Sequence, residues 1–580
     1  MPPDKLETIL LSWSALVPVS EGQDPLGLNL RVSTRLAGQL FHCITSITPR
    51  ARYYSFLPWA ISLAPQLGLG KPLRERVRSI EKAFATGCLL HHDGHACIDG
   101  RLVGSDILST WYNGRRGGKV DIDALPYAKN PALDAYIASL VNLRLFDIPE
   151  EVAEPESDED VQPTRLQDLS LSDLGQKVAA AFAKAVKSTS AEQIIRDGAH
   201  KAKDDDLIDW GKRGGLCELR SGGPDRPILR EIFFNRVGLE SMSHTWRRNT
   251  LLLMLHLADE LEKHDVPLDQ ETFGEAVYFG KVRDSNDTVW KVTWPDVLAD
   301  VAARWRMFYF HYYLSAVLEN LFIVIVSHGN LKRLEGFRLE ALLEPLSKAG
   351  FNRAFRKLIG VNYDGAFSDL TPAKLYTAAG VPVNSFDEAD SRALEKAVPL
   401  EHPLSEAQLH SILDQRERYG TDEAVALAAI LCSGLCLRYL QWENTPYGGW
   451  LAKAAGDDDP YQNVTVPVVV RELRLHYGDA LNVPFRDLLL HILHRFVIRL
   501  HLTLAYQKSG SFFFMDDERI RGRGKRYETP TYGNGRFFSG ILILKDLGLL
   551  EEQPDSGGLR HRTADGDALL AEELKAGTRG

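Results

Sequence analysis

The sequence predicts a mostly α-helical protein of several domains, a helical scaffold that ends in a small α+β domain. Over most of the chain, apolar residues recur at spacings of three and four, which is the pattern of helices with one buried face. Strand-like segments are rare and short, and the clearest ones lie after residue 510. A length of 580 residues suits about three or four domains of ordinary size. Together these observations predict helices packed on helices, with strands mainly at the C-terminal end.

The composition is that of a soluble globular protein. Hydrophobic residues make up 44% and charged residues 25% of the chain, and the formal net charge is −10. A chain with this charge is not a basic nucleic-acid-binding protein as a whole, so any such role depends on a local basic patch. The six cysteines are too sparse for a disulfide framework and suit a reducing compartment. Because no secretory signal and no uninterrupted membrane-spanning segment are found, we expect a cytoplasmic protein that does not enter a membrane.

An acidic segment marks the clearest boundary between domains. Seven acids fall between Glu150 and Asp160, where the sequence has no basic and no aromatic residue. Such a segment buries too little apolar surface to offset its ordering entropy, so we expect a solvated linker or loop. The predicted division is an N-terminal helical domain at 1–148, the linker at 149–164, a central helical domain at 165–395, its helical continuation at 396–482 and a C-terminal α+β domain at 483–580.

The predicted helices show start signals or a strong apolar pattern. One begins after Pro131 and ends near Leu145, and another has Asp173 near its start. The segment between Trp305 and Tyr313 is aromatic nearly all round, which predicts a helix enclosed by protein. The longer apolar helices are expected at 245–264, 294–326, 421–441 and 484–508.

The end of the chain combines a hairpin, a basic run and an amphipathic helix. A hairpin is predicted at 511–520, with its turn at Asp516–Glu518. A helix then ends at Gly548, and a turn at 554–558 predicts a two-stranded wing before a last short helix. The apolar face of the first helix consists of Phe537, Ile541, Leu544 and Leu547. The basic run, opposed only by Glu528, consists of Arg519, Arg521, Arg523, Lys525, Arg526 and Arg536.

This order of elements resembles the winged-helix superfamily over roughly the last 70 residues. The helix that precedes the hairpin leaves little room for the second helix of that family. The basic run lies before the helix that would read bases, so we expect contact with phosphates and little sequence preference. Winged helices also mediate dimerisation and contact with other protein subunits, so a protein-only role stays open, as does a different fold. The resemblance implies DNA contact through Arg519, Arg521, Arg523, Lys525, Arg526, Arg536, Arg560 and Arg562.

A basic and aromatic stretch near the N-terminus has two interpretations. Interleaved cations and aromatic rings can stack on single-stranded nucleic acid. They can equally be packed aromatic residues with arginine stems laid over them, and we favour this second interpretation. The run Arg50-Ala51-Arg52-Tyr53-Tyr54 is similar to stretches of uncharacterised bacterial proteins from phage-defence gene clusters. That similarity implies a prokaryotic multi-protein system and no known active site.

Possible metal ligands are concentrated between Cys88 and Cys97. Thiolates and imidazoles are good ligands for Zn²⁺, and His91, His92 and His95 lie between the two cysteines. The spacing matches no common zinc motif, and Asp93 followed by glycine is typical of a turn. We therefore favour an ordinary turn and expect no cofactor, with Cys88, His91, His95 and Cys97 as the alternative metal ligands.

Three residues of the helix at 484–508 form a cationic stripe. His491, His494 and Arg495 lie on one face at helical spacing. The stripe could extend a DNA-binding surface, or it could line the interface with another helix, and the sequence favours neither.

No common catalytic signature is found in the chain. The sequence contains no phosphate-binding loop, no nucleophile elbow and no zinc-protease motif. Asp555 with Glu573 and Lys575 has the composition of a metal-dependent nuclease, but Glu573 lies in a predicted helix where that chemistry needs a strand. We therefore expect an accessory or recruiting subunit of a defence-type system that contacts DNA phosphates. A protein-only adaptor and a metal-dependent nuclease are the alternatives.

Overall fold

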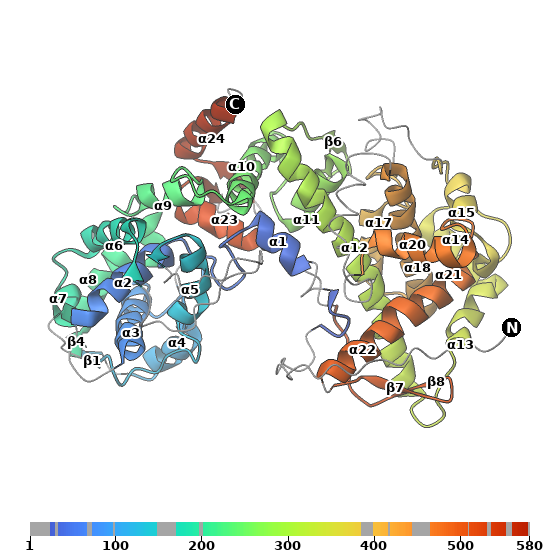
Figure 1. The fold of residues 1–580 in the computed structure, drawn as a ribbon, viewed down its shortest axis with the longest axis horizontal. Helices are drawn as coiled ribbons and strands as arrows, with labels where there is room; N and C mark the ends of the chain where they lie inside the picture. Colours follow the sequence, from blue (N-terminus) through green and yellow to red (C-terminus); the bar gives the residue numbers. More distant parts are fainter. Residues whose placement is uncertain are drawn as a thin grey trace. The chain divides into compact units, whose positions relative to one another are not determined.

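A computed structural model shows two compact units, each assembled from two separate stretches of the chain (Figure 1). The first unit combines Met1–Thr34 with Tyr309–Gly533, and the second combines Arg35–Phe308 with Asn534–Gly580. These units follow other boundaries than the predicted division into consecutive domains. The predicted linker at 149–164 lies outside the described residues. The structure describes residues 24–28, 33–66, 72–96, 99–115, 117–147, 170–196, 201–383, 398–415, 418–443, 464–508, 510–530, 535–552 and 559–577.

Helices dominate both units, as the periodicity predicts. In the described parts of the chain, strands occur only as five two-stranded antiparallel sheets. The mostly helical fold class is therefore confirmed. The strand pairs are β1 (Lys119–Asp121) with β4 (Lys201–Lys203), β2 (Phe146–Asp147) with β3 (Ser170–Leu171), β5 (Lys281–Arg283) with β6 (Val289–Lys291), β7 (Phe513–Asp516) with β8 (Arg519–Gly522), and β9 (Leu550–Glu552) with β10 (Arg560–Arg562).

The second unit is built around a close crossing of two helices, α3 and α8. A Cβ atom on Gly87 of α3 would lie 2.8 Å from the carbonyl oxygen of Leu207, and one on Gly211 of α8 would collide with the carbonyl of Gly87. Glycine at both positions lets the two backbones touch. The helices of this unit are α1 (Thr34–Leu40), α2 (Tyr53–Leu63), α3 (Leu73–His91), α4 (Ser105–Asn113), α5 (Ala132–Asn142), α6 (Asp173–Val186), α7 (Ser190–Arg196), α8 (Asp204–Gly214), the 3₁₀ turn η4 (Leu216–Leu219), α9 (Arg226–Phe233), α10 (Met242–Glu262), α11 (Gln270–Phe279), the first part of α12 (Asp296–Leu331), α23 (Phe537–Asp546) and α24 (Ala564–Gly577).

The arginine and tyrosine run at the start of α2 is the polar centre of this unit. Arg50 and Arg52 are fully buried, as are Tyr53 and Tyr54. Nε and Nη2 of Arg50 donate to the two carboxylate oxygens of Asp546 at 3.0 and 2.9 Å. The packing interpretation of this stretch is therefore confirmed, because buried rings and paired guanidinium groups cannot form a stacking surface for nucleic acid.

The first unit surrounds α18, which is apolar on all sides. Nearly every side chain of this helix is buried, including Arg438 near its end. Arg438 donates through Nη2 to Glu406 at 2.7 Å, so the buried charge is paired. The helices of this unit are the rest of α12, α13 (Glu340–Leu343), α14 (Ala349–Ile359), α15 (Pro372–Ala378), α17 (Glu406–Asp414), α18 (Thr421–Trp442), α20 (Val466–Tyr477), α21 (Phe485–Ile492), the π-helical segment Leu493–Ile498 and α22 (Arg499–Lys508).

The β7–β8 hairpin has the predicted position and turn. Asp517 and Glu518 adopt positive φ angles of 48° and 61° between the strands, as a tight hairpin turn requires. The base of the hairpin packs against α22, where His501 lies 4.9 Å from the ring of Phe513 (Figure 1). The hairpin is thus part of the first unit.

The remaining C-terminal elements belong to the second unit and follow the predicted order. The predicted apolar face of α23 is buried, and Gly548 adopts a φ of 65° after the helix. Glu573 of α24 pairs with Arg236 at 2.7 Å, and Arg562 of β10 pairs with Asp259 of α10 at 2.9 Å. The wing and the last helix are therefore tied to α10 and to the end of α9, over 300 positions earlier in the chain.

Among the described residues, three helices are long and apolar enough to cross a membrane by length and composition. They are α12, α18 and the segment Phe485–Tyr506. In the most apolar window of α12 and of α18, 89% of the residues are buried inside the fold, compared with 56% in the third segment. The apolar surface of the first two helices is thus used mainly in packing.

Candidate functional site

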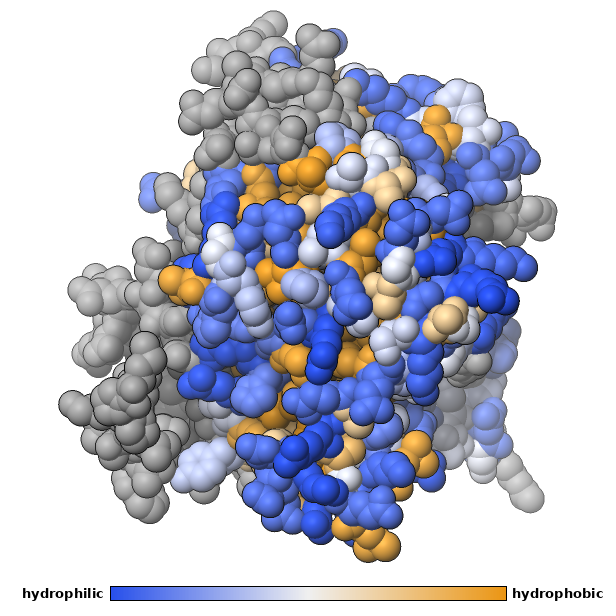
Figure 2. Space-filling view, turned by 90° about the vertical axis from the view of Figure 1, so that its right-hand side faces the viewer, coloured by the Kyte–Doolittle hydropathy of each residue, from blue (hydrophilic) through white to orange (hydrophobic). Residues whose placement is uncertain are grey.

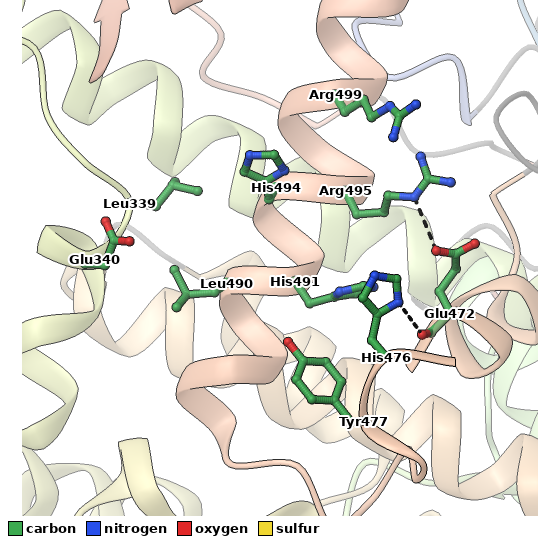
Figure 3. Close-up of a pocket in the computed structure, with 10 residues that line it drawn as sticks. All are labelled: Leu339, Glu340, Glu472, His476, Tyr477, Leu490, His491, His494, Arg495 and Arg499. Carbon is green, nitrogen blue, oxygen red and sulfur yellow. Dashed lines mark hydrogen bonds and ion pairs between the residues drawn. The ribbon is translucent and has the colours of Figure 1, made fainter. Parts of the chain in front are cut away.

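The cationic stripe predicted on the helix at 484–508 lines a pocket of the first unit. The pocket has a volume of about 570 Å³ and lies between the π-helical segment, the end of α20 and the start of α13 (Figure 3). Of the two interpretations left open by the sequence, the helix–helix interface describes His491 and Arg495 in part, because both contact α20, and the DNA-binding surface stays a prediction. The lining residues are Leu339, Glu340, Glu472, His476, Tyr477, Leu490, His491, His494, Arg495 and Arg499.

The π-helical segment determines how the stripe is presented. A π-helical turn holds one more residue than an α-helical turn, and such turns are often found at functional sites. Here it separates His491 at the end of α21 from Arg499 at the start of α22. Figure 3 shows His491 and Arg495 directed toward α20, with Arg499 above Arg495. Side chains from two successive helical segments therefore face the same pocket.

The pocket is lined by two arginines, three histidines and two acids, Glu340 and Glu472, and Glu472 is already engaged. Nε of Arg495 donates to Glu472 at 3.4 Å. The rings of His476 and His491 lie 4.8 Å apart, and Nε2 of His491 is buried without a hydrogen-bond partner among the described residues. Burial lowers the pKa of His491, and the neighbouring His476 and Arg495 lower it further. The arrangement can accept an anion at the guanidinium groups of Arg495 and Arg499.

The predicted basic run continues this surface on the hairpin. Arg523, Lys525 and Arg526 are exposed, and Arg526 is 85% exposed beside Glu528, which is 3.8 Å away. Nη1 of Arg519 donates to the carbonyl oxygen of Glu335 at 3.1 Å. Arg521 is half-buried and pairs with Asp516 of β7 at 3.0 Å. The last three cations of the run thus remain accessible to a ligand, because exposed pairs such as Arg526–Glu528 are weak.

The pocket and the hairpin are parts of one surface. Arg338 pairs with Glu518 of the hairpin turn at 3.4 Å, and the next residue, Leu339, lines the pocket. One continuous helix, 485–508, lines the pocket with Arg495 and Arg499 and supports the hairpin through His501. We call this surface the basic face and define it by Arg495, Arg499, Arg519, Arg521, Arg523, Lys525 and Arg526.

Apolar side chains are also exposed beside the hairpin. Leu331 and Leu334, at the end of α12 and in the loop after it, are 83% and 87% exposed, and Phe514 and Met515 of β7 are 38% and 41% exposed. Figure 2 looks at the side of the first unit that carries α13 to α15, where hydrophobic residues form small patches between hydrophilic ones. Surface patches of this kind occur at protein–protein interfaces as well as on unbound surfaces.

The predicted basic residues of the wing lie in the second unit and point to partners within it. Nη1 of Arg536 donates to the carbonyl oxygen of Ile44 at 3.0 Å. Arg560 donates to the carbonyl oxygen of Leu268, and Arg562 pairs with Asp567 at 2.7 Å in addition to Asp259. These three guanidinium groups therefore contribute to the packing of the fold.

The predicted metal ligands are only partly brought together. Cys88 is buried, His95 is exposed, and Cys97 lies outside the described residues. His91 and His92 of the predicted cluster lie together with Cys217, which the sequence did not single out. In the part of the chain that the structure describes, two further groups of this kind are His42, Cys43 and His244, and Glu472, His476 and His491.

The residues of the predicted nuclease motif have other partners or lie outside the described residues. Both carboxylate oxygens of Glu573 are engaged, one by Arg236 at 2.7 Å and the other by Nε of Arg248 at 2.8 Å. Asp555 lies outside the described residues. Two arginines on one carboxylate do not favour a metal ion there.

Sequence reasoning identified part of the pocket and missed the rest. Arg499 follows Arg495 by four positions, so helical spacing was a signal for it. His476 and Glu472 come from another helix, and no local pattern points to them. No known family model, no curated protein and no solved structure matches this chain.

Proposed function

We propose that the chain is an accessory, non-enzymatic scaffold that contacts nucleic-acid phosphates through the basic face of its first unit. It would act as a recruiting subunit of a prokaryotic multi-protein system, of the defence type that the similarity at residues 50–54 suggests. In this proposal the winged-helix-like elements of the second unit serve the fold, and the DNA-contacting residues are those before residue 530.

The observation that carries the proposal is that one helix serves two basic features. Its π-helical segment carries Arg495 and the start of α22 carries Arg499, and both arginines line the pocket. The same α22 also supports the hairpin after which Arg523, Lys525 and Arg526 are exposed. Guanidinium groups bind phosphate oxygens in a bidentate manner, and a row of cations follows a phosphate backbone. Ring contacts support the row, since the guanidinium of Arg523 lies 5.5 Å from the ring of Phe514.

A surface of this kind binds by releasing counterions, so its affinity must fall with salt. The net charge of −10 repels nucleic acid from the molecule as a whole, and because salt screens this repulsion, it offsets part of the salt dependence. The basic face carries no feature that reads base edges, so we expect similar affinity for different sequences.

Salt-dependent binding of the full chain to a short labelled DNA duplex, followed by fluorescence anisotropy, tests the proposal. The triple variant Arg523→Ala, Lys525→Ala and Arg526→Ala removes about three phosphate contacts. The slope of log affinity against log salt concentration should therefore become shallower by about 2.7.

A matched variant in the second unit controls for the loss of net charge. Lys177→Ala, Lys184→Ala and Lys187→Ala also removes three exposed cations, all from α6 or the residue after it. We expect this variant to bind as the wild-type chain does. Absence of salt-dependent binding by the wild-type chain, or equal loss in both triple variants, would contradict the proposal.

A second function, a protein-only adaptor, is favoured by the exposed apolar side chains beside the hairpin. Leu331 and Leu334 would then bind a partner protein, with the basic residues around them as the polar rim. Under this alternative, Leu331→Glu with Leu334→Glu abolishes co-purification with the product of a neighbouring gene. The basic-face triple variant keeps that association, and no DNA binding is observed for the wild-type chain.

A further inference from the structure

A cluster of metal-ligand side chains is assembled in the second unit. One ring nitrogen each of His91 and His92 and the sulfur of Cys217 all lie within 4.8 Å of one another. Glu218 adds a carboxylate, with Oε1 3.3 Å from Nε2 of His91 and 3.7 Å from the sulfur of Cys217. We propose that His91, His92 and Cys217 bind a zinc ion, with Glu218 as the fourth ligand.

The distances between the ligand atoms suit a tetrahedral ion. Zinc bonds of about 2.0–2.3 Å at tetrahedral angles place ligand atoms about 3.3–3.8 Å apart. Nε2 of His92 lies 3.0 Å from the sulfur of Cys217, and the two Glu218 distances are 3.3 and 3.7 Å. The other distances among the ligand atoms of His91, His92 and Cys217 are at most 4.8 Å. Small rotations of these side chains would bring them to the spacing of a tetrahedral zinc site.

The fold brings these residues together through the close crossing of α3 and α8. His91 follows Gly87 by one helical turn, and a Cβ on Gly211 would lie 2.9 Å from Cβ of His91. The chain leaves α8 at Gly214 and turns directly into η4, which carries Cys217 and Glu218. The glycine contact therefore fixes the end of α3 against the start of η4.

The segment that carries Cys217 and Glu218 is held on both sides. Nη1 of Arg52 donates to the carbonyl oxygen of Gly215 at 2.8 Å, and its Nη2 pairs with the buried Asp225 at 3.2 Å. Arg220 pairs with Asp99 from the other side. Because this segment is already held in place, binding of the ion carries no further entropic cost for ordering it.

Charge distinguishes this cluster from the two similar ones. Glu218 faces the first cluster, and the C-terminal end of α3 at His91 adds the negative end of a helix dipole. In the other two clusters a guanidinium is in contact, since Arg247 lies 2.8 Å from Nδ1 of His244 and Arg495 contacts Glu472. A cation in contact disfavours a metal ion, whereas a carboxylate favours one. The donor set of two imidazoles, a thiolate and a carboxylate suits zinc.

Half-burial of the ligands leaves a path for the ion. His91, His92, Cys217 and Glu218 are all intermediate in exposure, and the side chains of His91 and Glu218 are 20% and 28% exposed. The ion would join the end of α3 to η4, and removing it should lower the melting temperature of the chain.

Cobalt substitution of the full chain tests the site, because Co²⁺ occupies zinc sites and its thiolate complex absorbs light. The metal-free chain is titrated with Co²⁺ and then with Zn²⁺. We expect one equivalent of Co²⁺ with a thiolate-to-cobalt band that Zn²⁺ abolishes. Cys217→Ser should remove the band, and His92→Ala should weaken binding more than about 100-fold, since loss of an outer-shell partner already weakens binding 10–100-fold.

His95→Ala is the matched control, because His95 is an exposed neighbour that the cluster does not use. It should leave the band and the affinity unchanged. Circular dichroism of each metal-free variant verifies folding, and Glu218→Gln serves as a further ligand variant if Cys217→Ser does not fold. No cobalt binding by the wild-type chain, a band that survives in Cys217→Ser, or a band lost in His95→Ala would each overturn the proposal.

Discussion

The β7–β8 hairpin and the β9–β10 wing are both two-stranded ribbons with engaged arginines on the second strand, but only the hairpin is followed by exposed cations, Arg523, Lys525 and Arg526. In the wing, Arg560 binds the carbonyl oxygen of Leu268 and Arg562 pairs with Asp259 and Asp567. After the hairpin, Arg526 is 85% exposed, and its ion pair with Glu528 is long, at 3.8 Å. The difference comes from acids and carbonyl groups on neighbouring elements, so a basic ribbon alone does not indicate a nucleic-acid-binding surface.

If the C-terminal elements of the second unit stabilise the fold, the largest loss of stability should follow from a change at Asp546, which ties α23 to Arg50. Asp546 accepts both Arg50 nitrogens and the backbone nitrogen of Ala51 at 2.9 Å. Asp546→Ala leaves a buried arginine unpaired and should lower the free energy of unfolding by about 3–5 kcal/mol. Urea denaturation measures this change in the free energy of unfolding, with Glu551→Ala at an exposed residue as the control. A loss of under about 1 kcal/mol in Asp546→Ala would contradict a stabilising role for these elements.

The next effect concerns the support of the hairpin and depends on pH. Burial, together with the nearby charge of Lys525, lowers the pKa of His501 to about 4. Nδ1 of this neutral ring lies 3.0 Å from the carbonyl oxygen of Pro25, and Nε2 accepts from the backbone nitrogen of Phe512 at 3.2 Å. A second proton would remove that acceptor and break the contact with the hairpin.

The lowered pKa of His501 makes the folded chain less stable as the pH falls. The imidazole has a pKa near 6.5 in the unfolded chain and about 4 in the folded chain. Its contribution to the free energy of unfolding is therefore fully present above pH 6.5 and is lost as the pH falls toward 4. Between pH 7 and pH 5 the contribution should fall by about 2 kcal/mol. Urea denaturation of the wild-type chain and His501→Asn at both pH values measures the difference, and an equal pH dependence in both proteins would exclude this role.

A smaller effect separates the wing arginines from exposed cations. Arg562 is 16% exposed and pairs with two carboxylates, so Arg562→Ala should destabilise the chain by about 1 kcal/mol. Thermal denaturation measures the change. A variant as stable as the wild-type chain would place this arginine with the ligand-binding residues instead.

The smallest expected change in stability belongs to the hairpin. Arg526→Ala should alter the free energy of unfolding by less than about 0.5 kcal/mol, because the side chain is exposed and its ion pair is screened by water. The same variant should reduce the salt slope of DNA binding by about 0.9. A destabilisation comparable to that of Arg562→Ala would remove the distinction between the two ribbons.

Local patterns allowed prediction of the element types and of part of the site. Apolar spacing predicts α23, and the run at 511–520 predicts the hairpin, because both depend on residues close together in sequence. The partners of Arg562 and Cys217 could not be predicted in this way, since Asp259 and His92 come from distant segments. Whether a cation is exposed or engaged depends on such long-range contacts, and so does the meeting of metal ligands. The winged-helix resemblance and the cytoplasmic location stay predictions.

The ion pair between Arg50 and Asp546 has a consequence for biosynthesis. The two residues are 496 positions apart, so the arginine is made long before its partner leaves the ribosome. Until then, α2 cannot reach its final buried position without an unpaired charge in the core. Closure of so long a loop is also slow, because contacts of high sequence separation delay folding. The second unit should therefore complete its core only after α23 has been synthesised, and chains truncated before that point should be substrates for chaperones and proteases.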